Sequence, residues 1–221
     1  KVFFLYSFLT AIIFILFNFT GIRLFNSLNL AMTVSSAGAF LPTNSLSDIV
    51  KVTSQEVILS FGLIFSALNI YFFYSLFANF DKIKKHFEDF MIFGGIIISS
   101  LILFFSIGQV SFLDIFLNVI SSMSNSGISS YDPPKNFYLF FLFLTIIGGS
   151  VISNSSGIKF LRLYILFKST VLEIFKLVSP NVIIDQRILK TEHKINNENL
   201  NSSFFIFICF FISIFILSSI L

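Results

Sequence analysis

The sequence predicts an all-α integral membrane protein made of repeated units, each with a span, a short re-entrant pore helix and a second span. Of its 221 residues, 56% are hydrophobic and 11% are charged, and the mean hydropathy is +0.94. Soluble domains carry about 25% charged residues, so we expect lipid to surround most of this chain. Long apolar runs recur, and a shorter apolar run followed by a Ser/Asn/Gly stretch occurs twice.

Five segments approach the roughly 20 apolar residues that a membrane-spanning helix needs. They are 2–18, 56–80, 89–107, a segment from Phe137 that is interrupted at 148–157, and 203–221. Because the sequence starts at Lys1 without a charged leader and ends inside the fifth run, we expect it to be an excerpt of a longer protein.

The distribution of cations predicts how these spans are oriented. Lysine is concentrated in 81–88, and lysine and arginine in 159–194, whereas 19–55 and 109–136 hold one or two cations each. An excess of Lys and Arg marks the cytoplasmic side of a membrane protein. We therefore expect 81–88 and 179–202 to be cytoplasmic linkers, and the two segments with few cations to face outward.

Each outward segment contains a short apolar run, LFNSLNLAMTV after Arg23 and FLDIFLNVISSM after Ser111. A dozen residues form a helix of about 18 Å, which is too short to cross and too apolar to lie in water. We predict that both enter the membrane and turn back. Placing Gly38 over Gly127 aligns several residues, and the order of elements repeats around them. Internal repeats are common in transport proteins, and two pore repeats are predicted, 1–80 and 89–178.

The polar stretches after the short helices, 34–40 and 123–129, are the candidate ion-selectivity filters. Irregular backbone at membrane depth must face protein or a water-filled cavity, and rings of carbonyls can replace the water around a monovalent cation. The carboxyl ends of the short helices add partial negative charge, and Gly38 and Gly127 are expected to supply backbone angles that other residues resist. A Ser/Asn-rich external loop is the alternative interpretation. The candidate ion-binding residues, acting through backbone carbonyls alone, are Ser35, Ser36, Ala37, Gly38, Ser124, Asn125, Ser126 and Gly127.

The interruption at 148–157 is a second candidate site. Counted from Phe137, Gly148 lies about 16 Å along the helix, near the middle of a hydrocarbon core about 30 Å thick. A polar break at that depth is expected to lie below the filter as a movable plug, and the alternative is a glycine kink filled by neighbouring helices. Arg162 is expected to snorkel to the interface. The candidate gating residues are Gly148, Gly149, Ser150, Ser153, Asn154, Ser155, Ser156, Gly157 and Lys159.

The remaining polar residues predict neither an enzyme nor a cofactor site. His86 and His193 have no partners at metal-ligand spacing and are expected to be solvated, and the single Cys209 excludes a disulfide framework. Asp114 suits the N-terminal dipole of the second short helix. Asp132 could concentrate cations at a pore mouth or be a solvated turn residue. A net charge of +3 indicates no nucleic-acid partner.

The order MSNSGISSYD…FLFLTIIGGSVISNSSGIKFLRLYILFK resembles the third repeat of the Trk/Ktr/HKT superfamily of potassium transporters. The family's Gly/Ser-rich segment ending in Gly-Ile-Lys is matched by residues between Gly148 and Arg162. AMTVSSAGAF and the run after it look like the second repeat's filter and inner helix, and VSPNVI is similar to the segment before the fourth repeat. Val151-Ile152 and Ser156 replace small family residues, which predicts a bulkier loop.

The resemblance implies a pseudo-fourfold cation pore of which this chain holds repeats two and three and, in 203–221, the first span of repeat four. It implies potassium uptake across a plasma membrane, the bacterial inner membrane in particular, by a homodimer that binds a cytosolic nucleotide-binding regulatory ring. The choice between potassium and sodium, and between a channel and an ion-coupled carrier, stays open. The alternatives are a secondary transporter with broken helices for a substrate other than a cation, a membrane assembly subunit that transports nothing, and paired two-repeat chains that together complete four quadrants.

Overall fold

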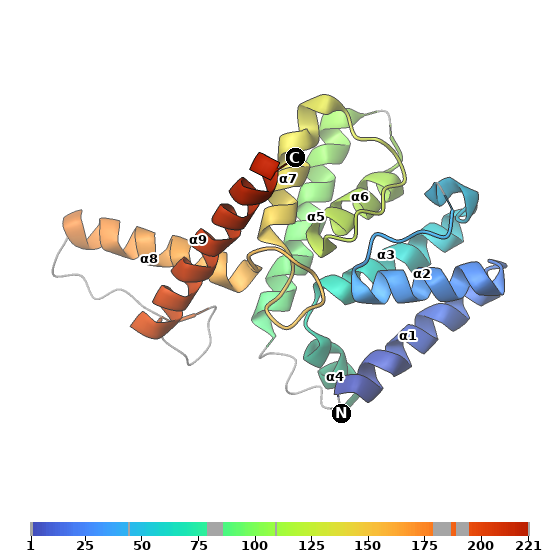
Figure 1. Ribbon diagram of the computed structural model, residues 1–221, viewed down its shortest axis with the longest axis horizontal. Coiled ribbons are helices and arrows are strands. Elements are labelled where there is room, and N and C mark those ends of the chain that lie inside the picture. Colours follow the sequence, from blue (N-terminus) through green and yellow to red (C-terminus); the bar gives the residue numbers. More distant parts are fainter. Residues whose placement is uncertain are drawn as a thin grey trace.

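The computed structural model describes residues 2–43, 45–78, 86–108, 110–178, 187–188 and 195–220, and within that part helices joined by irregular segments make up the fold (Figure 1). Two 3-10 turns, Leu46–Asp48 and Lys135–Phe137, accompany the α-helices. The α-helices are α1 (Val2–Phe19), α2 (Leu24–Ser36), α3 (Thr53–Ala67), α4 (Ile70–Ala78), α5 (Phe87–Ile107), α6 (Phe112–Ser124), α7 (Tyr138–Ile147), α8 (Phe160–Val178) and α9 (Asn197–Ile220).

Helices α1, α5 and α9 are each long and apolar enough to cross a membrane. Large apolar side chains on them face outward, among them Phe3, Phe105 and Phe215, as expected where lipid rather than water is the solvent. These features confirm the predicted all-α membrane class. Helix α9 begins at Asn197, inside the segment that was predicted as a linker. Most of the predicted linker residues, 81–85 and nearly all of 179–194 including His193, lie outside the described residues.

The predicted continuous span 56–80 is wrong. Helix α3 ends at Ala67 and α4 starts at Ile70, and the two helices are bent by 110°. Leu68 is extended, with φ −91° and ψ 164°, and the side-chain oxygen of Asn69 accepts a hydrogen bond from the backbone N–H of Tyr71 at 2.9 Å, which caps the new helix. Asn favours such caps over helix interiors, so Asn69 was the local signal for the break.

The helices form two packing units with similar neighbours. Short helix α2 packs against α1 and α3, and short helix α6 packs against α5 and α7. Helices α3 and α6 join the units, and α8 crosses α9 at one side (Figure 1). Gly62 permits close packing in the first unit, because a Cβ there would overlap Cγ1 of Val34.

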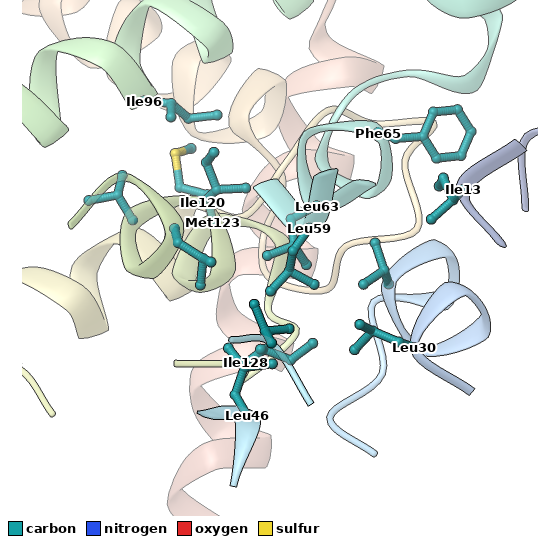
Figure 2. Close-up of a cluster of buried hydrophobic side chains, with 14 of the residues drawn as sticks. Ile13, Leu30, Leu46, Leu59, Leu63, Phe65, Ile96, Ile120, Met123 and Ile128 are labelled. Atoms are coloured by element: carbon teal, nitrogen blue, oxygen red, sulfur yellow. The ribbon is translucent and has the colours of Figure 1, made fainter. Parts of the chain in front are cut away.

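The core lies where the short helices meet α3. Figure 2 shows Leu30 of α2, Leu59 and Leu63 of α3, and Ile120 and Met123 of α6 gathered in one cluster, and all five are buried. Fully burying a Leu or Ile side chain stabilises a fold by about 1.5–3 kcal/mol where water is the reference. The cluster fixes the two short helices to a common support, so the segments that follow them start from defined positions.

Candidate functional site

Helices α2 and α6 end in the same way. Each has 13 residues and is followed by a left-handed residue, Ala37 (φ 53°, ψ 35°) or Asn125 (φ 59°, ψ 29°). The next backbone N–H closes the turn, from Gly38 to the oxygen of Thr33 at 2.8 Å and from Ser126 to the oxygen of Ser121 at 3.1 Å. This is the Schellman arrangement of a helix C-terminus. It turns the chain sharply at the end of each short helix and releases it as an irregular segment.

The shared cap corrects the predicted register of the repeat. Ala37 is equivalent to Asn125, so Gly38 is equivalent to Ser126 and not to Gly127. Gly127 has φ +66°, as predicted for a filter glycine, whereas Gly38 lies outside the left-handed region, so the expectation for Gly38 was wrong. Placing Gly38 over Gly127 also pairs Asn29 with Asn118, but their contacts differ, because Asn29 donates to Phe25 of its own helix and Asn118 donates to Tyr131.

One polar side chain on each short helix holds the segment that returns from it. Thr33 donates its hydroxyl to the backbone oxygen of Phe40 at 2.6 Å. Asn118 donates to the oxygen of Tyr131 at 2.9 Å and accepts from the N–H of Ser130 at 3.1 Å. Sequence reasoning missed both residues as supports. A polar residue facing inward on an otherwise apolar helix was the signal that could have found them.

The two candidate filter segments lie next to each other. A Cβ placed on Gly127 would be 3.4 Å from Cβ of Ala39, so the second segment contacts the first directly. Within the second segment, Ser124 and Ser126 are fully buried and their hydroxyls are 3.2 Å apart. These hydroxyls bond one another and so hold the buried turn at the end of α6.

A polar cavity of about 380 Å³ opens beside Gly127. It is lined by residues of both returning segments, Leu41, Ser45, Leu46, Ser47, Gly127, Ser129, Ser130, Tyr131 and Asp132. Asp132 is exposed at this cavity. A carboxylate there would raise the local concentration of cations, in keeping with the role considered for Asp132.

The interrupted helix is confirmed as a break, with α7 ending at Ile147 and α8 starting at Phe160. The segment between them, 148–159, is bonded into the gap between α3 and α4. The N–H of Ser150 donates to the oxygen of Ala67 at 2.9 Å, and the N–H groups of Asn154 and Ser155 donate to that of Ser66 at 3.2 and 3.3 Å. The N–H of Ile70 donates back to Ile152 at 3.2 Å. The two breaks therefore satisfy each other's backbone groups, as lipid-embedded backbone requires.

The same segment contacts both filter regions. The side-chain amide of Asn154 donates to the backbone oxygen of Ser35 at 2.7 Å, in the last turn of α2. The side-chain amide of Asn125 donates to the oxygen of Thr145, in the last turn of α7, at 3.1 Å. Segment 148–159 thus lies against the helix that carries the first filter segment, and the second filter segment is attached to the helix leading into the break.

The glycines of this segment are needed for its close packing. Gly148 and Gly157 have φ +68° and +89°, angles that other residues adopt only at a cost. A Cβ on Gly149 would lie 2.9 Å from the carbonyl carbon of Ala67 and closer still to its oxygen. Gly149 therefore allows the segment to touch the backbone of α3, and Gly148 allows the two ends of the segment to approach each other.

Lys159 points its ammonium group into the segment that precedes it. Nζ donates to the backbone oxygen of Ser153 at 3.2 Å and to that of Ser155. Its charge stabilises these carbonyls and the loop conformation. Arg162 donates to the oxygen of Ile158 at 3.4 Å.

Two further predictions about charged residues have clear outcomes. Asp114 is in the first turn of α6, where it accepts a hydrogen bond from the hydroxyl of Ser111 at 2.7 Å, so its structural role is confirmed. The prediction that His86 is solvated is wrong. Its ring is 16% exposed, Nδ1 is 3.3 Å from Asp89, and Nε2 is 3.1 Å from the hydroxyl of Ser75.

Glu88 and Asp89 were not predicted as site residues, yet both contact the paired breaks. Glu88 accepts a hydrogen bond from the N–H of Val151 at 3.0 Å, and Asp89 accepts one from the N–H of Asn69 at 2.8 Å. Two acidic residues at a helix start are common for electrostatic reasons alone, which hid this role in the sequence.

The fold and these paired re-entrant segments define the chain as an all-α integral membrane protein of the pore type. Among solved structures it is similar to the potassium transporter TrkH from Vibrio parahaemolyticus, with a TM-score of 0.83 and 17% sequence identity over 97% of this chain. The chain spans 48% of that transporter's length. No model of a protein family matches the sequence, and no curated protein matches it either. The chain therefore has the fold of a Trk-type potassium transporter.

Proposed function

We propose that this chain forms part of a transmembrane pathway for a monovalent cation, potassium in the first place. In this proposal, 35–38 and 124–127 contribute two quadrants of a selectivity filter through backbone carbonyls. The observation that carries it is that two short helices end in the same left-handed cap and deliver adjoining segments, with Gly127 beside Ala39. Left-handed caps are common at helix ends, so the stronger support is the contact between the two segments, which is the expected product of a repeated pore unit.

The proposal extends to segment 148–159 as a gate beneath the filter. Its support is the hydrogen bond from Asn154 to Ser35, since a segment bonded to the end of a pore helix lies next to the path that the helix points to. In the closed state the segment would obstruct that path, and its release from the α3–α4 break would open it. Potassium is favoured because the similar fold is that of a potassium transporter.

The remaining assignments follow from the family resemblance and are proposed on that basis. They are a pseudo-fourfold pore completed by two further repeats, a homodimer in a plasma membrane, and a cytosolic nucleotide-binding ring as regulator. The proposed repeats are 1–80 and 89–178, and the support for two repeats is that α2 packs against α1 and α3 as α6 packs against α5 and α7.

The filter assignment is tested by Gly127→Ser in the complete polypeptide, measured as rubidium uptake by cells that depend on it. A left-handed conformation costs a residue with a Cβ about 1–2 kcal/mol, and relaxation toward negative φ would turn the adjoining carbonyls away. We expect uptake to fall at least about tenfold, which corresponds to roughly 1.4 kcal/mol, while membrane expression holds.

Gly38→Ser is the matched control. Gly38 lies in the equivalent region but outside the left-handed range, and a Cβ there would meet the Ser36 hydroxyl at 3.2 Å. We therefore expect a smaller loss of uptake than at Gly127. Unchanged uptake and unchanged cation preference in Gly127→Ser would refute the filter assignment.

A further inference from the structure

The start of helix α5 places two neighbouring carboxylates on two different chain breaks. Glu88 accepts the N–H of Val151, inside the interrupted segment, at 3.0 Å. Asp89 accepts the N–H of Asn69, between α3 and α4, at 2.8 Å. Neither N–H group belongs to a helix, because Val151 lies between α7 and α8 and Asn69 lies between α3 and α4. Two neighbouring residues of α5 therefore bond the interrupted segment 148–159 and the break between α3 and α4.

Asp89 is held firmly in this position. Its side chain is 1% exposed, and its second oxygen is 3.3 Å from Nδ1 of His86. The other ring nitrogen of His86 is 3.1 Å from the hydroxyl of Ser75 on α4. Asp89 and His86 thus connect the start of α5 to the break and also to the helix that follows it.

A buried carboxylate is costly unless it is paired and hydrogen-bonded. Carboxylates stabilise the N-terminus of a helix through its dipole, and exposed carboxylates already do this. The helix dipole therefore does not explain why Asp89 is buried. The burial of Asp89 and the contact of Glu88 across to Val151 point to a different role, which is to order the backbone of the two breaks.

We propose that Glu88 and Asp89 are positioning residues that fasten the interrupted segment to the α3–α4 break, so that the two breaks move as one unit. Glu88 holds the segment from α5, Asp89 holds the break from the same turn, and the backbone bonds between 150–155 and 66–67 join them. Release of the segment then requires the Glu88 contact to open. This inference deepens the proposed gate and rests on it for its effect on flux.

The inference is tested first by structure, without reference to transport. Spin labels are attached at Ile152→Cys and Phe61→Cys in a Cys209→Ser background, since Ile152 and Phe61 are 50% and 67% exposed. The distance distribution between the labels is measured by pulsed electron paramagnetic resonance in the complete polypeptide in lipid. Glu88→Met, which keeps the side-chain length but removes both oxygens, is expected to broaden this distribution. Glu88→Gln keeps an acceptor for the N–H of Val151 and is expected to leave it narrow.

Glu198→Met is the matched control, because Glu198 is likewise the second residue of its helix, α9, and its side chain is exposed. Asp89→Ala frees the N–H of Asn69 and serves as the second test if Glu88→Met does not purify as a folded protein. It is also expected to broaden the distribution, with Asp89→Asn restoring it.

Rubidium efflux from proteoliposomes is measured on the same variants. We expect about a tenfold rise in basal efflux for Glu88→Met, equivalent to roughly 1.4 kcal/mol, the upper end of the net contribution of one hydrogen bond. An unchanged distance distribution in both Glu88→Met and Asp89→Ala would overturn the inference. A broadened distribution with unchanged efflux would support the fastening role and overturn the gating proposal instead.

Discussion

Gly149 offers the sharpest test of whether segment 148–159 is docked in the α3–α4 break. A Cβ at this position would lie 2.9 Å from the carbonyl carbon of Ala67, still nearer to its oxygen, and 2.5 Å from the hydroxyl of Ser155. The Ser155 hydroxyl can rotate away. The backbone of α3 cannot, because it belongs to the buried cluster around Leu63. In Gly149→Ala the segment must therefore move.

The size of the effect follows from the contacts that such a movement breaks. Relieving the overlap requires a shift on the order of 1 Å, which would take the 2.9 Å bond from Ser150 to Ala67 out of hydrogen-bond range. The weaker bonds of Asn154 and Ser155 to Ser66, at 3.2 and 3.3 Å, would be lost with it. Each such bond contributes about 1 kcal/mol net. Docking should weaken by about 1–3 kcal/mol, or roughly 5- to 150-fold.

Rubidium efflux from proteoliposomes that contain the complete polypeptide measures this change. We expect Gly149→Ala to raise basal efflux by at least about fivefold, the lower end of that range. Gly94→Ala is the control, because a Cβ on Gly94 of α5 meets nothing within 4 Å and efflux should not change. A folded Gly149→Ala protein with unaltered or lower efflux would show that the segment does not restrict flow.

Two further predictions concern the contacts near the filter. Asn154→Leu keeps the side-chain volume but removes the amide that donates to Ser35. Basal efflux should rise by a few-fold, which corresponds to the loss of one hydrogen bond of about 1 kcal/mol. Unchanged efflux would mean that this contact is not part of a closed state. Ser36→Cys and Asn125→Cys, each in a Cys209→Ser background, should react faster with a cationic than with a neutral thiol reagent, and rubidium should slow the reaction. Equal rates with both reagents, insensitive to rubidium, would place these residues away from an ion path.

The helices themselves could be predicted well from the sequence, because their lengths follow from bilayer physics. The short runs after Arg23 and Ser111 are too apolar for water and too short to span, and both became helices of 13 residues. The break at 148–157 could be predicted because adjacent glycines and serines disfavour a helix in a run that is otherwise uniformly apolar. The helix break therefore lies where the composition predicts it.

The break after Ala67 could not be predicted from composition, because its main cause lies far along the chain. The backbone oxygens of Ser66 and Ala67 accept hydrogen bonds from the N–H groups of Ser150, Asn154 and Ser155 instead of from the next turn of a helix. No local pattern near residue 67 reveals these distant donors. Asn69 was the only local signal for the break. The register of the repeat failed for a related reason. The left-handed residue of a helix cap can be Asn as well as Gly, and here the two caps are Ala37 and Asn125. Matching Gly38 to Gly127 therefore paired identical residues that occupy different positions in the two caps.

The contacts of segment 148–159 suit an element that is docked but can be released. It is held mainly by backbone hydrogen bonds at the α3–α4 break, by Asn154 and by Glu88, and Ile158 is its only fully buried large apolar residue within the described chain. Hydrogen bonds of about 1 kcal/mol each sum to a docking free energy of a few kcal/mol. A ligand needs about 5.5 kcal/mol of differential affinity to convert a 1:99 population into 99:1. The docking free energy of a segment anchored by a large apolar cluster would exceed that differential affinity, whereas the docking free energy of a segment held by these hydrogen bonds is smaller than it.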